Sequence, residues 1–143
     1  MKILFVCTGN TCRSPMACAL MKHLGEQKNL SLSCDSAGIY ANEGTPISSE
    51  AKKVLEDSFG IFGWDHRSKQ VTKEQIDESD LVLAVTREHR DLLIRRFGGE
   101  EKILAFSEDV GDPFGGDLSR YQKSAEKILE NLNRLVESGV IHD

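Results

Sequence analysis

The chain has 143 residues, the size of one compact domain, and we expect a single domain over residues 1–143. Charged residues make up 29% of it and hydrophobic residues 39%, as in soluble globular proteins, and no apolar run is long enough to cross a bilayer. The net charge of −5 and the lack of a long basic stripe argue against a nucleic-acid-binding protein. We therefore expect neither a nucleic-acid nor a membrane partner, and we favour a monomer.

The first half of the chain predicts two strands and two helices. Residues 2–6 are a continuous apolar run, as in a strand covered on both faces of a parallel sheet. The Ser-Pro pair at 14–15 predicts a helix start, because proline suits the first helical position, and apolar residues recur up to Gly25. Residues 30–35 alternate between apolar and polar, which predicts a strand near a sheet edge. A Thr-Pro pair and a following glycine predict a second helix over 45–59.

The second half predicts two more strands and three helices. Residues 72–75 have the capping-box spacing of a short helix, and apolar strands follow at 81–85 and 102–106. A helix over about 87–97 lies between them and ends at a Gly-Gly pair. The last helix carries a core-facing stripe at helical spacing: Leu118, Tyr121, Ala125, Ile128, Leu129, Leu132, Leu135 and Val136.

Strands that alternate with helices predict an α/β fold, with a four-stranded parallel sheet flanked by helices and right-handed crossovers. Sites in such sheets lie outside the carboxyl ends of the strands. Cys7 follows the first strand, and Asp112 lies in the loop SEDVGDPFGGD after the fourth. We expect these two residues to meet at one edge of the sheet.

The segment CTGNTCRSP, residues 7–15, predicts a phosphate-binding loop after the first strand. Its small residues, with Gly9 free to adopt conformations closed to other residues, can direct backbone N–H groups inward, and the helix start adds a positive dipole end. Arg13 supplies a planar fork of donors that matches two phosphate oxygens. At the floor of this positive cup, Cys7 should have a lowered pKa and act as a nucleophile.

Other kinds of site fit this segment poorly. The G-x-x-x-x-G-K-[ST] nucleotide motif is absent, and one glycine does not make a dinucleotide fingerprint. Cys7 and Cys12, without a paired set of Cys or His, leave a tetrahedral metal site incomplete. We expect no cofactor and no metal.

The sequence resembles the low-molecular-weight protein tyrosine phosphatase family over most of its length. The stretches FVCTGNTCRSPMA, SAGIYA, SDLVLAVT and DPFGG match the family in its order. The resemblance implies that Cys7 is the nucleophile, that Arg13 holds the phosphoryl oxygens and that Ser14 donates a hydrogen bond to the thiolate. Asn10 would hold the loop's shape. The implied phosphate-binding residues are Thr8, Gly9, Asn10, Thr11, Cys12, Arg13 and Ser14.

The aspartate of DPFGG, Asp112, matches the family's general acid, and Pro113 restricts it to extended backbone. Asp109 and Asp117 are the alternatives, as loop and helix-start carboxylates. In the implied mechanism, Cys7 attacks phosphorus while Asp112 protonates the leaving atom, and water deprotonated by Asp112 then hydrolyses the phosphocysteine. No metal is required.

Two positions favour phosphoarginine on proteins over phosphotyrosine as the substrate. Tyrosine-specific relatives usually carry a larger aliphatic residue at Thr11 and often tyrosine or tryptophan at Phe114, whereas this chain resembles the bacterial protein-arginine phosphatase branch. The Thr11 hydroxyl can orient a guanidinium, and its β-branch narrows the slot. Tyr40 and Phe114 can wall the slot and stack on either substrate. Alternatively, Thr11 stands there only for the backbone shape of the loop, and phosphotyrosine is the alternative substrate.

All four cysteines lie in the first quarter of the chain, and no export signal precedes the first strand. We therefore expect a cytoplasmic protein with free thiols. Cys12 lies close enough in the loop to form a disulfide with Cys7 on oxidation, which would protect the nucleophile. The alternative is a thiol that only fills the loop. Cys18 stands where the family commonly has glutamate.

Two readings from other classes compete with a phosphatase. Thioredoxin-coupled arsenate reductase resembles this fold and loop, but it relays a disulfide through two further downstream cysteines, and none follows Cys34. A non-catalytic phosphate-binding module would need neither Cys7 nor Asp112. Asp80 resembles a recurrent family position, and we interpret it as a structural residue at a strand entrance.

Overall fold

The computed structural model describes residues 1–143 and contains four strands and five helices. In chain order they are β1 (Lys2–Cys7), α1 (Arg13–Gln27), β2 (Ser33–Gly38), α2 (Ser49–Phe59), α3 (Lys73–Glu78), β3 (Leu81–Ala84), α4 (Arg87–Phe97), β4 (Ile103–Ala105) and α5 (Leu118–Glu137). None of the helices combines the length and apolarity that a membrane crossing requires. The expected α/β fold, a single domain, is confirmed.

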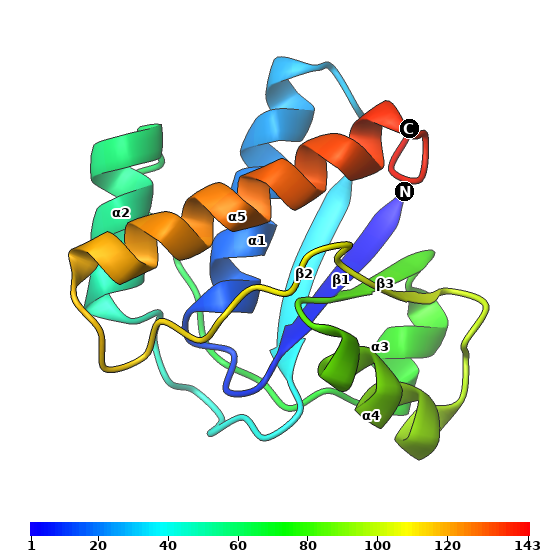
Figure 1. The fold of residues 1–143 in the computed structure, drawn as a ribbon. Helices are drawn as coiled ribbons and strands as arrows, with labels where there is room; N and C mark the ends of the chain where they lie inside the picture. Colours follow the sequence, from blue (N-terminus) through cyan, green and yellow to red (C-terminus); the bar gives the residue numbers. More distant parts are fainter.

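All strand pairs in the sheet are parallel, in the order β2-β1-β3-β4 (Figure 1). The apolar run of β1 is explained by its central position, with a strand on each side and helices on both faces. The second strand, β2, lies at an edge, as predicted. In the register of β1 and β2, Cys7 is paired with Gly38, so both strands end at the same level.

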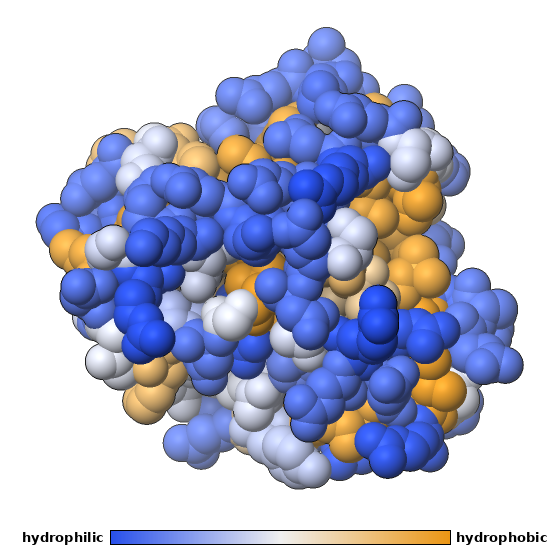
Figure 2. Space-filling model, in the orientation of Figure 1, coloured by the Kyte–Doolittle hydropathy of each residue, from blue (hydrophilic) through white to orange (hydrophobic).

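Alternate residues of β1 divide between two hydrophobic clusters. Ile3 and Phe5 belong to the cluster formed with α1, α2 and α5 on one face of the sheet. Leu4 and Val6 belong to the cluster formed with α3 and α4 on the other face. Figure 1 shows these three layers, and Figure 2 shows that the same view of the surface is largely hydrophilic with scattered apolar patches.

Two predicted boundaries are wrong because tertiary partners decide them. The strand predicted over 30–35 occupies Ser33–Gly38, since β1 offers its first pairing residue, Lys2, opposite Ser33. The helix predicted from residue 45 begins at Ser49 instead. Residues 45–48 are held by other segments: Pro46 forms a β-bridge with Arg67, and the Ser48 side chain caps α2.

Smaller differences affect the ends of the first and last helices. The first helix begins at Arg13, so Pro15 is its third residue, and it continues past Gly25 to Gln27. Proline is tolerated there because N–H groups of the first helical turn have no intrahelical acceptor. In the stripe of α5, Leu118 is 42% exposed because it lies at the very start of the helix.

Other local signals are confirmed. The capping box of α3 is present, with Thr72 and Gln75 exchanging hydrogen bonds, and α4 has the predicted bounds. Asp80 accepts a hydrogen bond from the backbone N–H of Lys2 at 2.7 Å, which agrees with a structural position at the entrance of β3.

Candidate active site

A pocket of about 250 Å³, here called the thiol pocket, opens at the carboxyl end of β1. Its lining consists of Cys7, Thr8, Gly9, Asn10, Thr11, Cys12, Arg13, Asp112 and Phe114. The predicted phosphate loop and the predicted general acid therefore meet at one edge of the sheet. The N–H groups of Gly9, Thr11 and Cys12 donate no hydrogen bond within the protein, so they can bind an anion.

The thiol of Cys7 lies at the floor of this pocket and is held by two residues of the loop. Its Sγ lies 2.9 Å from Oγ of Ser14 and accepts a hydrogen bond from the Asn10 N–H at 3.3 Å. Nδ2 of Asn10 donates to Oγ of Ser14 at 2.8 Å, so Ser14 keeps its own proton for another acceptor. The sulfur is a nearer acceptor than the carbonyl of Ala37 at 3.4 Å.

The predicted lowering of the Cys7 pKa is wrong. Burial raises this pKa and is the largest effect, because Cys7 is only 2% exposed. Hydrogen bonds from Ser14, the charge of Arg13 and the Asn10 N–H act in the opposite direction. The sequence indicates the positive surroundings of the sulfur but not its burial in the apolar cluster on one face of the sheet.

Asn10 shapes the loop. Its φ is 60°, in the left-handed region, whereas Gly9, which is free to adopt such conformations, does not have a positive φ. Its side chain donates to Oγ of Ser36 at 3.0 Å and accepts from the N–H of Lys69 at 2.9 Å. Its carbonyl lies 2.6 Å from Nε2 of His66. Ser36 and His66 could not be predicted as partners of the loop, because only the fold brings them to it.

Arg13 extends from the start of α1 to the loop that carries Asp112. Its Nη1 donates to the carbonyl of Val110 at 2.9 Å, and the residue is only 6% exposed. Its Nη2 lies 3.8 Å from Oδ2 of Asp112, whose side chain is 55% exposed. The other carboxylate oxygen of Asp112 accepts from the Phe114 N–H at 3.1 Å. Asp112 thus faces the buried guanidinium while remaining open to solvent.

The two alternative carboxylates, Asp109 and Asp117, accept hydrogen bonds from backbone N–H groups. Oδ1 of Asp109 accepts a hydrogen bond from the Arg87 N–H at 2.9 Å, at the start of α4. Asp117 is the N-cap of α5 and accepts from the Arg120 N–H at 3.1 Å. Neither lines the thiol pocket.

A buried histidine supports the loop from α4. The Nδ1 of His89 lies 2.5 Å from Oγ1 of Thr86, and its Nε2 lies 2.8 Å from Oγ1 of Thr8. The same Thr8 oxygen accepts from Nη2 of Arg13 at 3.4 Å, which connects His89 to Arg13. Burial, followed by the charge of Arg13, lowers the pKa of His89 to about 4, so the ring is neutral at pH 7. We missed this residue, although a threonine cap three positions before it was a local signal.

The predicted selectivity residues lie in two places. Thr11 and Phe114 line the thiol pocket, whereas Tyr40 lines a neighbouring pocket of about 360 Å³ on the other side of Arg13. Phe114 is 75% exposed and Tyr40 is 65% exposed, with the Arg96 guanidinium 5.5 Å from the Tyr40 ring centroid. The structure therefore does not bring Tyr40 into the pocket that holds the thiol.

The thiol of Cys12, a lining residue of the thiol pocket, contacts two hydroxyl groups. Its Sγ lies 3.4 Å from Oγ of Ser48 and 3.6 Å from the Tyr121 hydroxyl. All four cysteines of the chain are free thiols.

The chain is similar to known proteins over nearly its whole length. The family model described as low molecular weight phosphotyrosine protein phosphatase matches residues 2–140. The chain is 41% identical to a protein-arginine-phosphatase of Geobacillus stearothermophilus over 145 residues, covering 95% of this chain and 94% of that protein.

Two solved structures superpose on nearly the whole chain. One is a C7S mutant of the YwlE arginine phosphatase with a phosphorylated active-site serine, at 34% identity, covering 96% of this chain and 95% of that chain with a TM-score of 0.90. The other is a low molecular weight protein tyrosine phosphatase of T. tengcongensis, at 39% identity, covering 96% and 99% with a TM-score of 0.92.

Proposed function

We propose that this chain, which belongs to the low-molecular-weight phosphotyrosine protein phosphatase family, hydrolyses phosphoarginine on proteins. The reaction passes through a phosphocysteine intermediate at Cys7. An enzyme of this family is a phosphatase, and no relay cysteines for an arsenate reductase follow Cys34. The observation that carries the proposal is the meeting of Cys7, Arg13 and Asp112 in the thiol pocket, with free backbone N–H groups around them.

In the first displacement, the Cys7 thiolate attacks phosphorus in line with the leaving nitrogen. The S–P bond forms as the P–N bond breaks, and Asp112 gives its proton to the nitrogen, so that arginine leaves as a guanidinium. Arg13 and the N–H groups of the loop bind the three phosphoryl oxygens and stabilise the charge that develops on them. Burial disfavours the charged thiolate of Cys7. The hydrogen bond from Ser14 stabilises this thiolate and so favours the attack.

In the second displacement, water attacks the phosphorus of the phosphocysteine. Asp112, now a carboxylate, accepts a proton from this water, the S–P bond breaks and the thiolate of Cys7 is restored as inorganic phosphate leaves. The exposed carboxylate of Asp112 is in contact with the solvent that supplies the water.

The choice of phosphoarginine over phosphotyrosine rests on Thr11 and Phe114. The protein-arginine-phosphatase of Geobacillus stearothermophilus is 41% identical to this chain, and the protein tyrosine phosphatase of T. tengcongensis is 39% identical. Overall identity therefore does not decide between the two substrates. The Thr11 hydroxyl has only one weak contact, 3.7 Å to the sulfur of Cys12, and is free to bind a guanidinium N–H. Phe114, which lines the same pocket, can stack on the guanidinium plane.

The same proposal includes phosphorylated proteins as partners and a cytoplasmic location. A thiol nucleophile must stay reduced, and all four cysteines of this chain are free, which fits a reducing compartment.

The test compares kcat/KM for a phosphoarginine peptide and a matched phosphotyrosine peptide without added metal. We expect at least about a tenfold preference for phosphoarginine, lost in Thr11→Ile, and no turnover in Cys7→Ser. A preference of the wild-type enzyme for phosphotyrosine would keep the mechanism and refute the substrate. Full activity of Cys7→Ser would refute the mechanism.

A further inference from the structure

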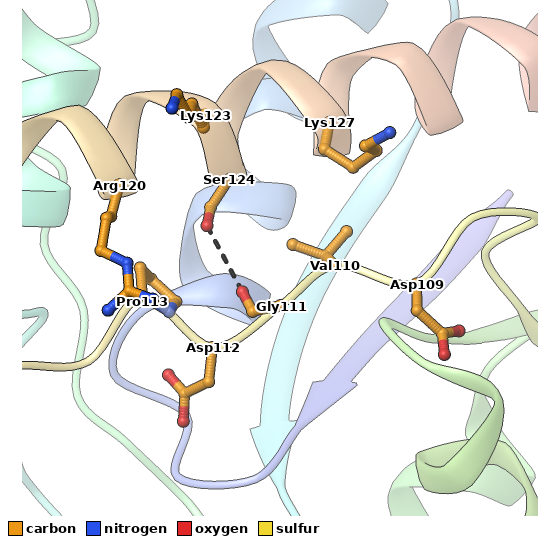
Figure 3. A pocket seen from close by; sticks show the side chains of 9 residues that line it. All are labelled: Asp109, Val110, Gly111, Asp112, Pro113, Arg120, Lys123, Ser124 and Lys127. Carbon is orange, nitrogen blue, oxygen red and sulfur yellow. Dashed lines mark hydrogen bonds between the residues drawn. The ribbon is translucent and has the colours of Figure 1, made fainter. Parts of the chain in front are cut away.

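A second pocket, of about 260 Å³, lies beside the thiol pocket, between α5 and the loop from Asp109 to Pro113 (Figure 3). We call it the flank pocket. Its cationic lining comes entirely from α5 and consists of Arg120, Lys123 and Lys127. In Figure 3, Arg120 and Ser124 extend from the helix toward the loop, where Ser124 donates to the carbonyl of Gly111 at 3.4 Å.

Two of these three cations have no counter-charge. Lys127 pairs with Glu108 at 2.5 Å, but no carboxylate lies within 4.0 Å of the side-chain nitrogens of Arg120 or Lys123. Two carboxylates of the loop also line the pocket, but each has a partner of its own: Asp109 accepts from the Arg87 N–H, and Asp112 faces Arg13. The flank pocket therefore offers two free cationic groups to a ligand.

Arg120 packs against the loop that carries Asp112. A Cβ at Gly116 would overlap Cδ of Arg120 and would lie 2.9 Å from the carbonyl of Pro113. The glycine of the DPFGG segment thus makes room for the aliphatic part of Arg120. Figure 3 shows Arg120 beside Pro113, and the flank pocket shares Asp112 with the thiol pocket.

We infer that the flank pocket binds an aspartate or glutamate side chain of the substrate protein, within about three residues of the phosphorylated residue. The inference rests on the proposed function. A substrate whose phosphoryl group reaches Cys7 passes Asp112, and an extended peptide advances about 3.3 Å per residue, so a nearby side chain reaches the adjacent pocket. The Arg120 fork matches a carboxylate. Because the enzyme carries a net charge of −5, these local cations also offset its repulsion of acidic substrates.

The test uses peptides with glutamate, glutamine or lysine two residues from the phosphorylated residue, prepared in a phosphoarginine and a phosphotyrosine series. For the wild-type enzyme we expect kcat/KM to be about fivefold higher with glutamate than with glutamine. In the double variant Arg120→Glu/Lys123→Glu the order should reverse, so that the lysine peptide is preferred. The glutamine peptide is the internal reference for the activity of each variant.

The double variant Lys28→Glu/Lys52→Glu is the matched control, because it changes the net charge equally at exposed positions outside both pockets. It should keep the wild-type preference. An unchanged preference in Arg120→Glu/Lys123→Glu, or an equal loss in the control, would overturn the inference. If neither phosphopeptide series is hydrolysed, the proposed function is refuted, but the inference about the flank pocket is still tested. The preference for the glutamate over the glutamine peptide is then measured as the ratio of their Kd values.

Discussion

Oγ of Ser14 lies 2.9 Å from Sγ of Cys7 and accepts a hydrogen bond from the Asn10 side chain, which directs the serine proton toward the sulfur. This side-chain hydrogen bond is the largest of the effects that lower the Cys7 pKa against the opposing effect of burial. Ser14 therefore controls how readily this buried cysteine becomes a thiolate.

The variant Ser14→Ala should raise the pKa of Cys7 further, because it removes that hydrogen bond and leaves burial unchanged. The midpoint of iodoacetate alkylation should move to higher pH, and kcat/KM at pH 7 should fall by about tenfold or more. Ser36→Ala is the control, because Ser36 also bonds to Asn10 but does not contact the sulfur. An alkylation midpoint that stays in place in Ser14→Ala would contradict this prediction.

The variant Asp112→Asn should lower kcat by about 10²- to 10⁴-fold, because an amide can neither protonate the leaving nitrogen nor deprotonate water. The measurement is the pH profile of kcat for a phosphoarginine peptide. Asp109→Asn should cost at most a few-fold, since an asparagine oxygen can still accept the Arg87 N–H. Equal losses in the two variants would mean that Asp112 is not the general acid.

The order and type of all nine elements could be predicted because their local signals agree with the fold. Thr86 and Gly98 mark the ends of α4, and the structure has the same bounds. The errors occur where a distant segment decides. Ser33 begins β2 because Lys2 pairs with it, and residues 45–48 stay extended because Arg67 lies beside Pro46.

The residues of the site also fall into those that local patterns predict and those that only the fold brings together. Cys7, Arg13 and Asp112 could be predicted, because a local motif and the rule of strand ends place them together. His66 and His89 reach the loop only through the fold, and neither belongs to a motif around the cysteine. The direction in which the Cys7 pKa shifts depends on how deeply the thiol is buried, and a local sequence pattern does not indicate this depth.

His89 should make stability depend on pH. Its pKa is lowered to about 4 in the folded state from 6.5, so the unfolded chain binds a proton first as the pH falls. The contribution is complete above pH 6.5 and is lost as the pH falls toward 4, by about 2 kcal/mol at pH 5. Arg13, Asp109 and Asp112 are the charged groups that act on the ring.

Urea unfolding of wild type and His89→Gln at pH 8 and pH 5 measures this effect. The variant should be less stable at pH 8, because Thr8 and Thr86 lose well-placed partners, and its stability should change less between the two pH values. His142→Gln, at an exposed terminal position, should behave as the wild type. An unchanged pH dependence in His89→Gln would contradict the neutral, buried histidine.

Cys12 should protect Cys7 from irreversible oxidation. Peroxide converts the Cys7 thiolate to a sulfenic acid, and attack by the Cys12 thiol forms a disulfide and releases water. Activity of the wild type after a peroxide pulse should return with dithiothreitol, whereas Cys12→Ser should stay inactive through sulfinic acid formation. Cys18→Ser is the control, because Cys18 is buried in α1 outside the thiol pocket. Equal recovery of Cys12→Ser and wild type would leave Cys12 as a loop-filling thiol.

Gly38 should be required for the shape of the phosphate loop. A Cβ there would lie 2.6 Å from the carbonyl oxygen of Thr8 and 3.1 Å from Cβ of Asn10. The backbone of Gly38 is bound on both sides, since its N–H donates to Lys69 and its carbonyl accepts from Val71, each at 2.9 Å. The Thr8 carbonyl is held as well, by the Tyr40 N–H at 2.9 Å, so the added Cβ of Gly38→Ala must displace hydrogen-bonded backbone.

We expect Gly38→Ala to lower the free energy of unfolding by about 1–3 kcal/mol, the usual cost of overpacking. It should also lower kcat/KM by more than this loss of stability alone explains, because Thr8 and Asn10 belong to the loop around Cys7. Gly111→Ala is the matched control for stability, since a Cβ at Gly111 would meet no atom within 4 Å. If Gly38→Ala retained wild-type stability and wild-type kcat/KM, the close approach of β2 to the loop would not be what requires glycine at this position.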